Sequence, residues 1–363
     1  MKMRERKILI TAPSLDTRLN VSGISSVTNF IISNNKNCRY QHFELGRRDD
    51  EKRNILWLLG MIKTAGKWMV TVPSKKIELV HFNFALSRAS ILRDVPLVLF
   101  AKFVGKKMLI HIHGGDYLSN KAAPRWMQGF LKKAFSGNTA VIVLSADEKT
   151  MIAERYMAKN ITILPNCVDV KEAQAFKRNH TGNAVVKLLF IGRISKAKGL
   201  DFIYDALSEL KTKQVPFKFF MAGTGADEKE YVKKFAELLG DSFDFKGVVS
   251  GTIKTELYKN CDVFLLPSLF EGLPMSLLEA MSFGLVPVVT DVGAMSDAVI
   301  NGKTGIIIEM NDHTATEMVK AIDQLVNNTD LVQQLGVNAA NFIFTNYSPV
   351  KYVEQLNKIY TEA

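Results

Sequence analysis

Short apolar segments alternate along the chain with longer segments that have the periodicity of amphipathic helices. In the first half, the apolar segments are residues 7–11, 77–83, 107–111, 140–144 and 161–164. In the second half, they are residues 185–191, 217–221, 243–246, 263–267, 286–290 and 305–308. Strands that alternate with helices form parallel sheets covered by helices on both faces. The sequence therefore predicts an α/β protein with two Rossmann-like, doubly wound parallel-sheet domains.

A polar connector divides the two halves. It runs from Lys171 to Asn183, and we place the domain boundary near 170–183. The first domain is predicted to span residues 1–170 and the second residues 183–346. Helical periodicity continues at 315–326 and 330–344, and Pro349 begins a last helix that reaches residue 363.

The net charge lies almost entirely in the first half. Residues 1–170 contain 27 basic and 13 acidic residues, whereas the rest of the chain contains 20 and 23. A basic domain is typical of proteins that bind nucleic acid, an anionic membrane or an acidic substrate. No apolar run reaches the ~18 residues of a membrane span, and the charged first residues predict no signal peptide. Three cysteines without metal-ligand spacing favour a reducing compartment.

Two carboxylates eight positions apart are the strongest candidates for chemistry. Glu271 follows the apolar segment 263–267, and Glu279 lies on the helix that is predicted to begin at Pro274 and to end before Gly284. Ligands bind at the carboxyl ends of parallel strands, and the N–H groups at a helix start attract anions. The pair thus fits a nucleotide-sugar, although a surface loop followed by a solvated Glu explains the same spacing.

Residues 270–281 resemble the Glu-x7-Glu signature of retaining glycosyltransferases of the GT-B fold, specifically family 4 of bacterial polysaccharide and lipid glycosyltransferases. Further segments resemble this family in the expected order: residues 164–169, 191–199, 220–225, 244–248, 288–293 and 301–305. The first half matches less well, and acceptor recognition is expected there. The resemblance implies two domains that face each other across a cleft, with the last helix, 347–363, crossing back to the first.

The resemblance also implies the roles of individual residues. Arg193 and Lys198 would stabilise the charge of the leaving diphosphate without a metal ion, Glu271 would position the donor sugar, and Glu279 would accept the ribose hydroxyls. His113 would lie near the reaction centre. The implied catalytic set is His113, Arg193, Lys198 and Glu271, and the implied donor-binding set is Gly23, Arg193, Lys198, Gly223, Val248, Glu271, Gly272, Leu273, Pro274, Met275, Ser276 and Glu279. Solvated loop cations are the plainer reading of Arg193 and Lys198.

The acceptor candidates have plainer alternatives as well. Asp116 is a candidate contact or base, and Asn166 lies in a turn that either shapes the cleft or is a simple Asx turn. The family usually has two adjacent glycines where this chain has Ser22 and Gly23, so the geometry of that loop is open. His111 is expected in the core, and with His113 it lacks the third ligand of a metal site.

Two amphipathic segments, 52–68 and 123–135, combine cations with Trp, Leu, Ile or Phe. Such helices either lie in a lipid interface or pack on a sheet. The aromatic residues are not interleaved with cations as in nucleic-acid binding proteins, so no nucleic-acid partner is expected.

We therefore expect a metal-independent retaining glycosyltransferase without a cofactor. It would move a hexose-type sugar from a nucleotide-sugar, UDP-linked rather than GDP-linked, to a glycan or a polyprenyl- or other lipid-linked acceptor in cell-surface polysaccharide synthesis. It would be cytoplasmic and peripheral on the inner face of the membrane. The alternative is a non-catalytic GT-B subunit that binds a glycan or protein partner.

Overall fold

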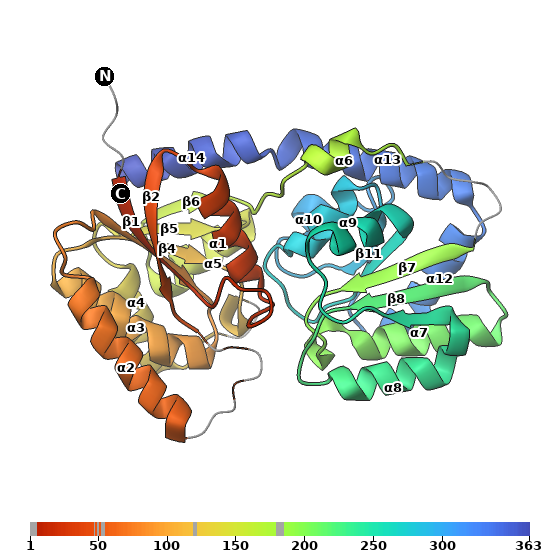
Figure 1. Cartoon of the computed structure of the whole chain (residues 1–363), viewed down its shortest axis with the longest axis horizontal. Helices are drawn as coiled ribbons and strands as arrows, with labels where there is room; N and C mark the ends of the chain where they lie inside the picture. The colour runs from red at the N-terminus through yellow and green to blue at the C-terminus, as the bar shows by residue number, and fades with distance from the viewer. Residues whose placement is uncertain (1–5, 47, 49–50, 52–54, 119–121, 179–184) are drawn as a thin grey trace. The chain divides into compact units, whose positions relative to one another are not determined.

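The computed structural model describes residues 6–363 except 47, 49–50, 52–54, 119–121 and 179–184. The first five residues, the start of the amphipathic segment 52–68 and the last part of the connector 171–183 lie outside the described residues. The chain divides into two compact units (Figure 1). Unit 1 comprises residues 1–166 and 349–363, and unit 2 comprises residues 167–348.

Unit 1 is built on a parallel sheet whose six described strands have the order β2-β1-β3-β4-β5-β6. The strands are β1 (Arg6–Ala12), β2 (Cys38–Glu44), β3 (Leu79–Phe84), β4 (Lys107–Ile112), β5 (Ala140–Val143) and β6 (Asn160–Ile163). The helices are α1 (Gly23–Asn34), α2 (Ile55–Thr71), α3 (Arg88–Phe103), α4 (Arg125–Phe135), α5 (Ala146–Tyr156) and α14 (Pro349–Glu362). Helices α2, α3 and α4 lie together on one side of this sheet (Figure 1).

The sequence pattern predicted the other strands of unit 1 but missed β2. This strand is at the edge of the sheet and carries Arg39, Gln41, His42 and Glu44 among its seven residues. Only Cys38 and Phe43 are buried in it. An edge strand with partly exposed faces has no continuous apolar run, so its sequence resembles that of a loop.

Unit 2 repeats the architecture with a parallel sheet of the order β12-β11-β10-β7-β8-β9. Its described strands are β7 (Val186–Ile191), β8 (Phe217–Ala222), β9 (Phe243–Phe245), β10 (Val263–Leu266), β11 (Val286–Thr290) and β12 (Ile306–Ile308). Its helices are α6 (Lys171–Ala175), α7 (Leu200–Thr212), α8 (Glu228–Leu239), α9 (Gly251–Asn260), α10 (Met275–Ser282), α11 (Met295–Ala298), α12 (Thr314–Val326) and α13 (Thr329–Asn346). As Figure 1 shows, α7 and α8 lie on one side of the sheet and α9 and α10 on the other.

The first part of the predicted connector is packed on unit 2. Arg178 donates hydrogen bonds to the carbonyl oxygens of Cys261, at 2.5 Å, and of Tyr258, at 2.6 Å. The ring of Phe176 lies 6.1 Å from that of Phe283. These contacts explain why residues 167–178 belong to unit 2 although their composition is polar.

The last helix belongs to unit 1. The Tyr360 side chain on α14 is buried and its hydroxyl hydrogen-bonds to His81 Nδ1 on β3, at 2.7 Å. Asn357 Oδ1 accepts a hydrogen bond from Asn35 Nδ2, at 2.8 Å. Both contacts join residues about 280 to 320 positions apart in sequence.

Candidate functional site

The loops at the carboxyl edge of the sheet in unit 2 bring together most of the predicted donor-binding residues. Arg193 and Lys198 follow β7, Gly223 follows β8, Val248 follows β9, and Glu271 follows β10. Residues 272–276 continue from Glu271 into α10, which carries Glu279. Because the strands are parallel, their carboxyl ends meet at one edge, and these residues share it.

Glu271 is held by two side chains from different loops. Lys198 forms an ion pair with Oε1 of Glu271, and Ser268 Oγ donates a hydrogen bond to the same oxygen, at 2.7 Å. The Lys198 side chain is 23% exposed and that of Glu271 is 9% exposed. Ser268 is buried, and its carbonyl oxygen accepts a hydrogen bond from Thr290 Oγ1, at 2.6 Å. The structure thus fixes a cation beside the carboxylate at this sheet edge.

Glycines let the backbones of these loops approach closely. Gly199 has φ +72°, and a Cβ there would lie 1.8 Å from the carbonyl oxygen of Pro267. Gly223 has φ +131°, and its Cβ would lie 1.9 Å from the carbonyl oxygen of Gly192. The N–H of Leu269 also donates to the carbonyl oxygen of Ala197, at 2.9 Å. The loops after β7, β8 and β10 are therefore packed at backbone contact distance.

Helix α10 begins one residue later than predicted. Pro274 is the N-cap of α10, and Met275 is the first helical residue. The prediction of Pro274 at the first helical position was wrong by one residue, because Pro274 has ψ 128°, which is extended backbone. Gly284 follows the helix with φ +76°, as expected for the residue after a C-cap. Leu273 and Met275 are buried, whereas Gly272, Pro274 and Ser276 are partly exposed.

Glu279 is held by two residues of α9 that the sequence analysis did not single out. Lys254 Nζ lies 2.6 Å from Oε2 of Glu279, and Tyr258 donates its hydroxyl to the same oxygen, at 2.9 Å. Burial and then the Glu279 carboxylate raise the pKa of Tyr258 well above its ordinary value. Lys254 Nζ also donates to Oε1 of Glu279, at 2.8 Å. A carboxylate has about four lone-pair sites, so Glu279 can accept one further hydroxyl group as it stands, and a second one where Lys254 gives up one of its two contacts.

The other predicted residues lie in unit 1. Gly23 is the first residue of α1, is exposed, and has no atom within 4 Å of the position of an added Cβ. Asp116 is exposed at the start of a 3-10 turn (Asp116–Leu118), and Asn166 is buried. His113 follows β4 and is partly exposed.

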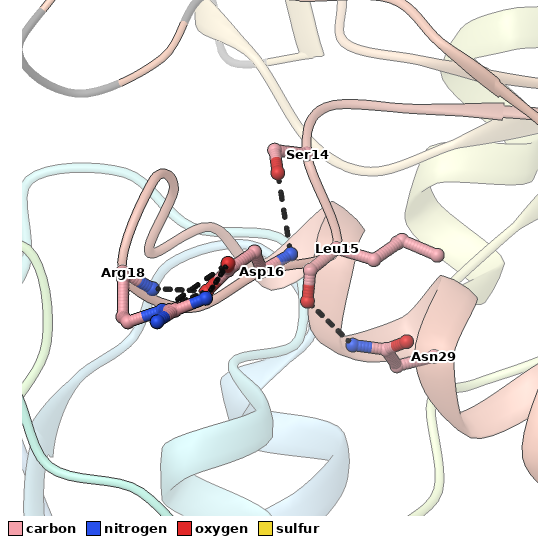
Figure 2. A network of polar contacts seen from close by, with 5 residues as sticks. All are labelled: Ser14, Leu15, Asp16, Arg18 and Asn29. Atoms are coloured by element: carbon pink, nitrogen blue, oxygen red, sulfur yellow. Dashed lines mark hydrogen bonds and ion pairs between the residues drawn. The ribbon is translucent and has the colours of Figure 1, made fainter.

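The loop between β1 and α1, whose geometry the sequence left open, is folded by its own polar contacts (Figure 2). Asp16 accepts hydrogen bonds from the Arg18 backbone N–H, at 3.0 Å, and from its guanidinium group, at 2.6 Å. Arg18 lowers the pKa of Asp16 to about 2. Asn29 Nδ2 donates to the carbonyl oxygen of Leu15, at 3.2 Å, which ties the loop to α1. Ser22, where the resemblance leads us to expect a second glycine, is the N-cap of α1.

Asn83 on β3 orients His113. Its Nδ2 donates to the carbonyl oxygen of Thr11, at 2.6 Å, so its Oδ1 is the atom that faces His113 Nε2, at 2.6 Å. An amide oxygen only accepts, so His113 carries its proton on Nε2 and presents Nδ1 as an acceptor. The protein groups around the His113 ring keep most of it from water although the residue is partly exposed, and this desolvation lowers its pKa to about 3, so the ring is neutral at physiological pH.

A row of histidines runs from His113 into the core. The ring of His111 lies 4.1 Å from that of His113, and His111 Nδ1 lies 3.2 Å from His81 Nε2. Both His81 and His111 are fully buried, in agreement with the expectation that His111 is a core residue. Burial lowers the pKa of His111 well below its ordinary value and that of His81 to about 3. In the part of the chain that the structure describes, no group of three or more His, Cys, Asp or Glu side chains is arranged to hold a metal ion.

The buried histidines predict that acid destabilises unit 1. His81 ordinarily has a pKa of 6.5 and has one of about 3 in the folded chain. Between pH 6.5 and pH 3 the unfolded chain binds more protons at this residue than the folded chain does. The free energy of unfolding therefore has its full value above pH 6.5 and decreases as the pH falls toward 3, by up to about 1.4 kcal/mol per pH unit. The His81→Gln variant keeps hydrogen-bonding groups but does not titrate. Its free energy of unfolding, measured with denaturant at pH 7, 6, 5 and 4, should fall less steeply than that of the wild type; equal slopes would contradict the role given to His81.

The two amphipathic helices, α2 and α4, both pack within unit 1 and also expose apolar side chains. On α2, Trp68 is buried and donates its indole N–H to the carbonyl oxygen of Leu97, at 3.0 Å. On α4, Met127 and Leu131 are buried, whereas Trp126 is 51% and Phe130 48% exposed. No helix among the described residues has the length and apolar content that a membrane span requires.

In comparisons with known proteins, this chain is similar to glycosyltransferases. Residues 170–342 match the family "Glycosyl transferases group 1". The chain is 27% identical over 320 residues to a UDP-Gal:alpha-D-GlcNAc-diphosphoundecaprenol alpha-1,3-galactosyltransferase of Escherichia coli, covering 80% of this chain and 77% of that protein. It is 28% identical over 312 residues to an uncharacterized glycosyltransferase of Haemophilus influenzae, covering 84% of this chain and 85% of that protein.

Solved structures show the same fold. The Anabaena protein HepE in complex with UDP-glucose aligns with a TM-score of 0.75 at 16% identity, over 98% of this chain and all of that one. A sucrose-phosphate synthase from Thermosynechococcus elongatus aligns with a TM-score of 0.75 at 16% identity, over 99% of each chain. Two α/β units with parallel six-stranded sheets, as in these GT-B neighbours, confirm the predicted fold class.

Proposed function

We propose that the protein is a retaining glycosyltransferase, in keeping with the match of residues 170–342 to the family "Glycosyl transferases group 1". It moves a hexose-type sugar from a nucleotide-sugar to a glycan or lipid-linked acceptor in cell-surface polysaccharide synthesis. The observation that carries the proposal is the contact of Lys198 with Glu271 at the edge of β10, directly before α10. A fixed cation, a sugar-positioning carboxylate and a helix N-terminus are the groups that a nucleotide-sugar donor requires.

The donor is placed by three parts of unit 2. The diphosphate lies near Lys198, Arg193 and the first N–H groups of α10, where negative charge that grows on the leaving group is stabilised more than in the ground state. These fixed cations take the place of a metal ion. Glu271 accepts hydroxyl groups of the hexose, and Glu279 accepts the two hydroxyls of the ribose. Because UDP stands in the names of the galactosyltransferase relative and of the HepE complex, we propose UDP-sugar over GDP-sugar as the donor.

Transfer proceeds on the face of the sugar from which the diphosphate leaves. The bond between the anomeric carbon and the diphosphate oxygen breaks, the acceptor oxygen bonds to the same carbon, and the acceptor proton passes to the departing diphosphate. His113 contributes the lone pair of Nδ1 as a hydrogen-bond acceptor near the sugar. Glu271 has a positioning role, since Lys198 and Ser268 already occupy one of its oxygens.

The acceptor is bound by unit 1, at the membrane surface. The E. coli relative is named for a diphosphoundecaprenol-linked substrate, which supports a lipid-linked acceptor here. Exposed aromatic residues on α4 stand beside the exposed cations Arg125, Lys132 and Lys133. Such a helix binds an anionic lipid interface, so we place the protein peripherally on the cytoplasmic face of the membrane.

The donor site is tested by thermal shifts with UDP, GDP and ADP in buffer that contains EDTA. A nucleotide at about 100 times its Kd should raise the free energy of unfolding by roughly 2.7 kcal/mol. Glu279→Ala should abolish the shift, because it removes the ribose acceptor. Glu256→Ala is the matched control, since Glu256 is an exposed carboxylate on α9, which also carries the Glu279 partners. A shift that survives in Glu279→Ala contradicts the assignment of Glu279.

A further inference from the structure

Unit 1 contains a cavity of about 410 Å³ that the proposed donor site does not use. It lies between the carboxyl end of β2, helix α2 and helix α3. Its volume is in the range of small-molecule sites in proteins. The lining residues that carry the argument are Arg48, Trp57, Met61, Lys63, Lys67 and Leu92.

Two of the lining cations have no carboxylate partner among the described residues. Lys63 and Lys67 lie one helical turn apart on α2, both exposed, and Lys67 Nζ lies 5.6 Å from the centre of the Phe43 ring. By contrast, Arg48 pairs with Glu44, at 3.0 Å, and Arg93 pairs with the buried carboxylate of its neighbour Asp94. Side chains four residues apart on a helix have Cβ atoms about 5–6 Å apart, so both ammonium groups can reach one diphosphate.

The rest of the lining is mixed, with the carboxylates of Glu44 and Glu51 and the hydroxyl of Thr64 among apolar side chains. Trp57, Met61 and Leu92 face the cavity. On the opposite side of α2 from Trp57 and Met61, Ile55, Leu59 and Ile62 are 77%, 56% and 62% exposed. Their spacing of four and three residues makes one stripe along the helix, and Lys63 follows Ile62 directly at the edge of this stripe. The cavity therefore places the two lysines beside apolar side chains that can contact the start of a hydrocarbon chain.

We propose that this cavity binds the diphosphate and the first isoprene units of a polyprenyl-diphosphate-linked acceptor. The inference rests on the lipid-linked acceptor proposed above and assigns it a place. The cavity adjoins β2 at its carboxyl end, and His113 follows β4 at the same edge of the sheet. In the order β2-β1-β3-β4 the two strands are three spacings apart, about 14 Å. A sugar attached to a diphosphate at Lys63 and Lys67 extends along this edge toward His113.

The test is a calorimetric titration of the full chain with farnesyl diphosphate below its micelle concentration. Farnesyl diphosphate should bind at least tenfold more tightly than inorganic diphosphate, because the apolar lining contributes. The variant Lys63→Ala/Lys67→Ala should weaken this binding at least tenfold. Lys75→Ala/Lys76→Ala, which removes two exposed lysines of unit 1 that do not line the cavity, should bind as the wild type does.

A second pair of variants tests the cavity without removing charge. Gly60 lines the cavity and Gly66 does not, and both lie within α2 with no atom within 4 Å of an added Cβ. Both glycines therefore accept a larger side chain without a clash, and glutamine favours the helix over glycine. Gly60→Gln should weaken farnesyl diphosphate binding at least tenfold, and Gly66→Gln should not change it.

Three results would overturn the inference: no binding by the wild type, binding unchanged in both cavity variants, or displacement of farnesyl diphosphate by phosphatidylglycerol vesicles at equal lipid phosphate. The last would assign the cavity to membrane phospholipid. The UDP thermal shift is measured on the same samples. If UDP stabilises the wild type while farnesyl diphosphate does not bind, only the cavity assignment fails. If no nucleotide stabilises it, the proposed function fails, whatever the cavity binds.

Discussion

Lys198→Ala is expected to lower kcat by about 10²- to 10³-fold, the usual effect of removing one group that stabilises developing charge. Lys198 is the cation that contacts Glu271, and its side chain is three-quarters buried within unit 2. Its charge acts there in a site of lower dielectric than bulk water, where electrostatic interactions are stronger. The measurement is the initial rate of nucleoside diphosphate release from the donor, with KM determined in the same series.

Lys196→Ala is the matched control for this prediction. Lys196 lies in the same 3-10 turn (Lys196–Lys198) but is exposed. Its backbone N–H is bonded to Asp227 Oδ2, at 3.0 Å, and this bond survives truncation of the side chain. We expect kcat within about twofold of the wild type, in keeping with the small effects of surface substitutions. If Lys198→Ala retained more than a tenth of the wild-type kcat, the role of Lys198 at the leaving group would be wrong.

Gly199→Ala is expected to destabilise unit 2 by more than about 3 kcal/mol. A left-handed conformation costs a non-glycine residue about 1–2 kcal/mol. The added Cβ would also lie 1.8 Å from the Pro267 carbonyl oxygen, so the loop after β7 must move away from the loop after β10. Because Lys198 and Glu271 belong to these two loops, the UDP thermal shift should be lost as well. Denaturant unfolding measures the first effect.

Gly302→Ala separates the free-energy cost of the left-handed backbone conformation from the cost of the steric clash. Gly302 has φ +69°, close to that of Gly199, but no atom lies within 4 Å of an added Cβ. Only the conformational cost of about 1–2 kcal/mol is therefore expected. Equal losses in the two variants would show that the close approach at Pro267 contributes nothing.

The fold could be predicted where each strand is buried on both faces. The strands β7, β10 and β11 consist of Val, Leu, Ile and Phe except for Lys187, Pro287 and Thr290, and such apolar runs are recognised without tertiary information. The edge strand β2 could not be found in this way, since its pattern depends on which face the neighbouring helices cover. Pro274 was placed one residue too far along because a proline is equally acceptable just before a helix and at its first position.

The candidate site was predictable in its residue types but not in its supporting contacts. Glu271 and Glu279 could be selected from their spacing and from the glycosyltransferase resemblance. Lys254 and Tyr258, which hold Glu279, lie on α9, a different helix from that of Glu279, and they have no local signature. Asn83, which fixes the proton on His113, precedes it by 30 positions and lies on the adjacent strand. Such partners follow from strand order, which periodicity does not specify.

The cavity between β2, α2 and α3 could not be predicted from the sequence either. The segment around Lys63 and Lys67 was recognised as amphipathic, but a helical pattern does not distinguish a face that packs on the core from one that lines a cavity. The distinction arises because β2, which the sequence analysis missed, ends beside α2.

The central claim is that the chain transfers a sugar from a nucleotide-sugar bound by unit 2. It is tested most directly by the release of nucleoside diphosphate from UDP-, GDP- and ADP-hexoses in EDTA, with a bacterial lipid extract as the source of acceptor. We predict release from one donor class by the wild type, most of it dependent on the extract, and its near loss in Lys198→Ala. No release from any donor, together with no stabilisation by any nucleotide, would contradict the claim and favour a non-catalytic GT-B subunit.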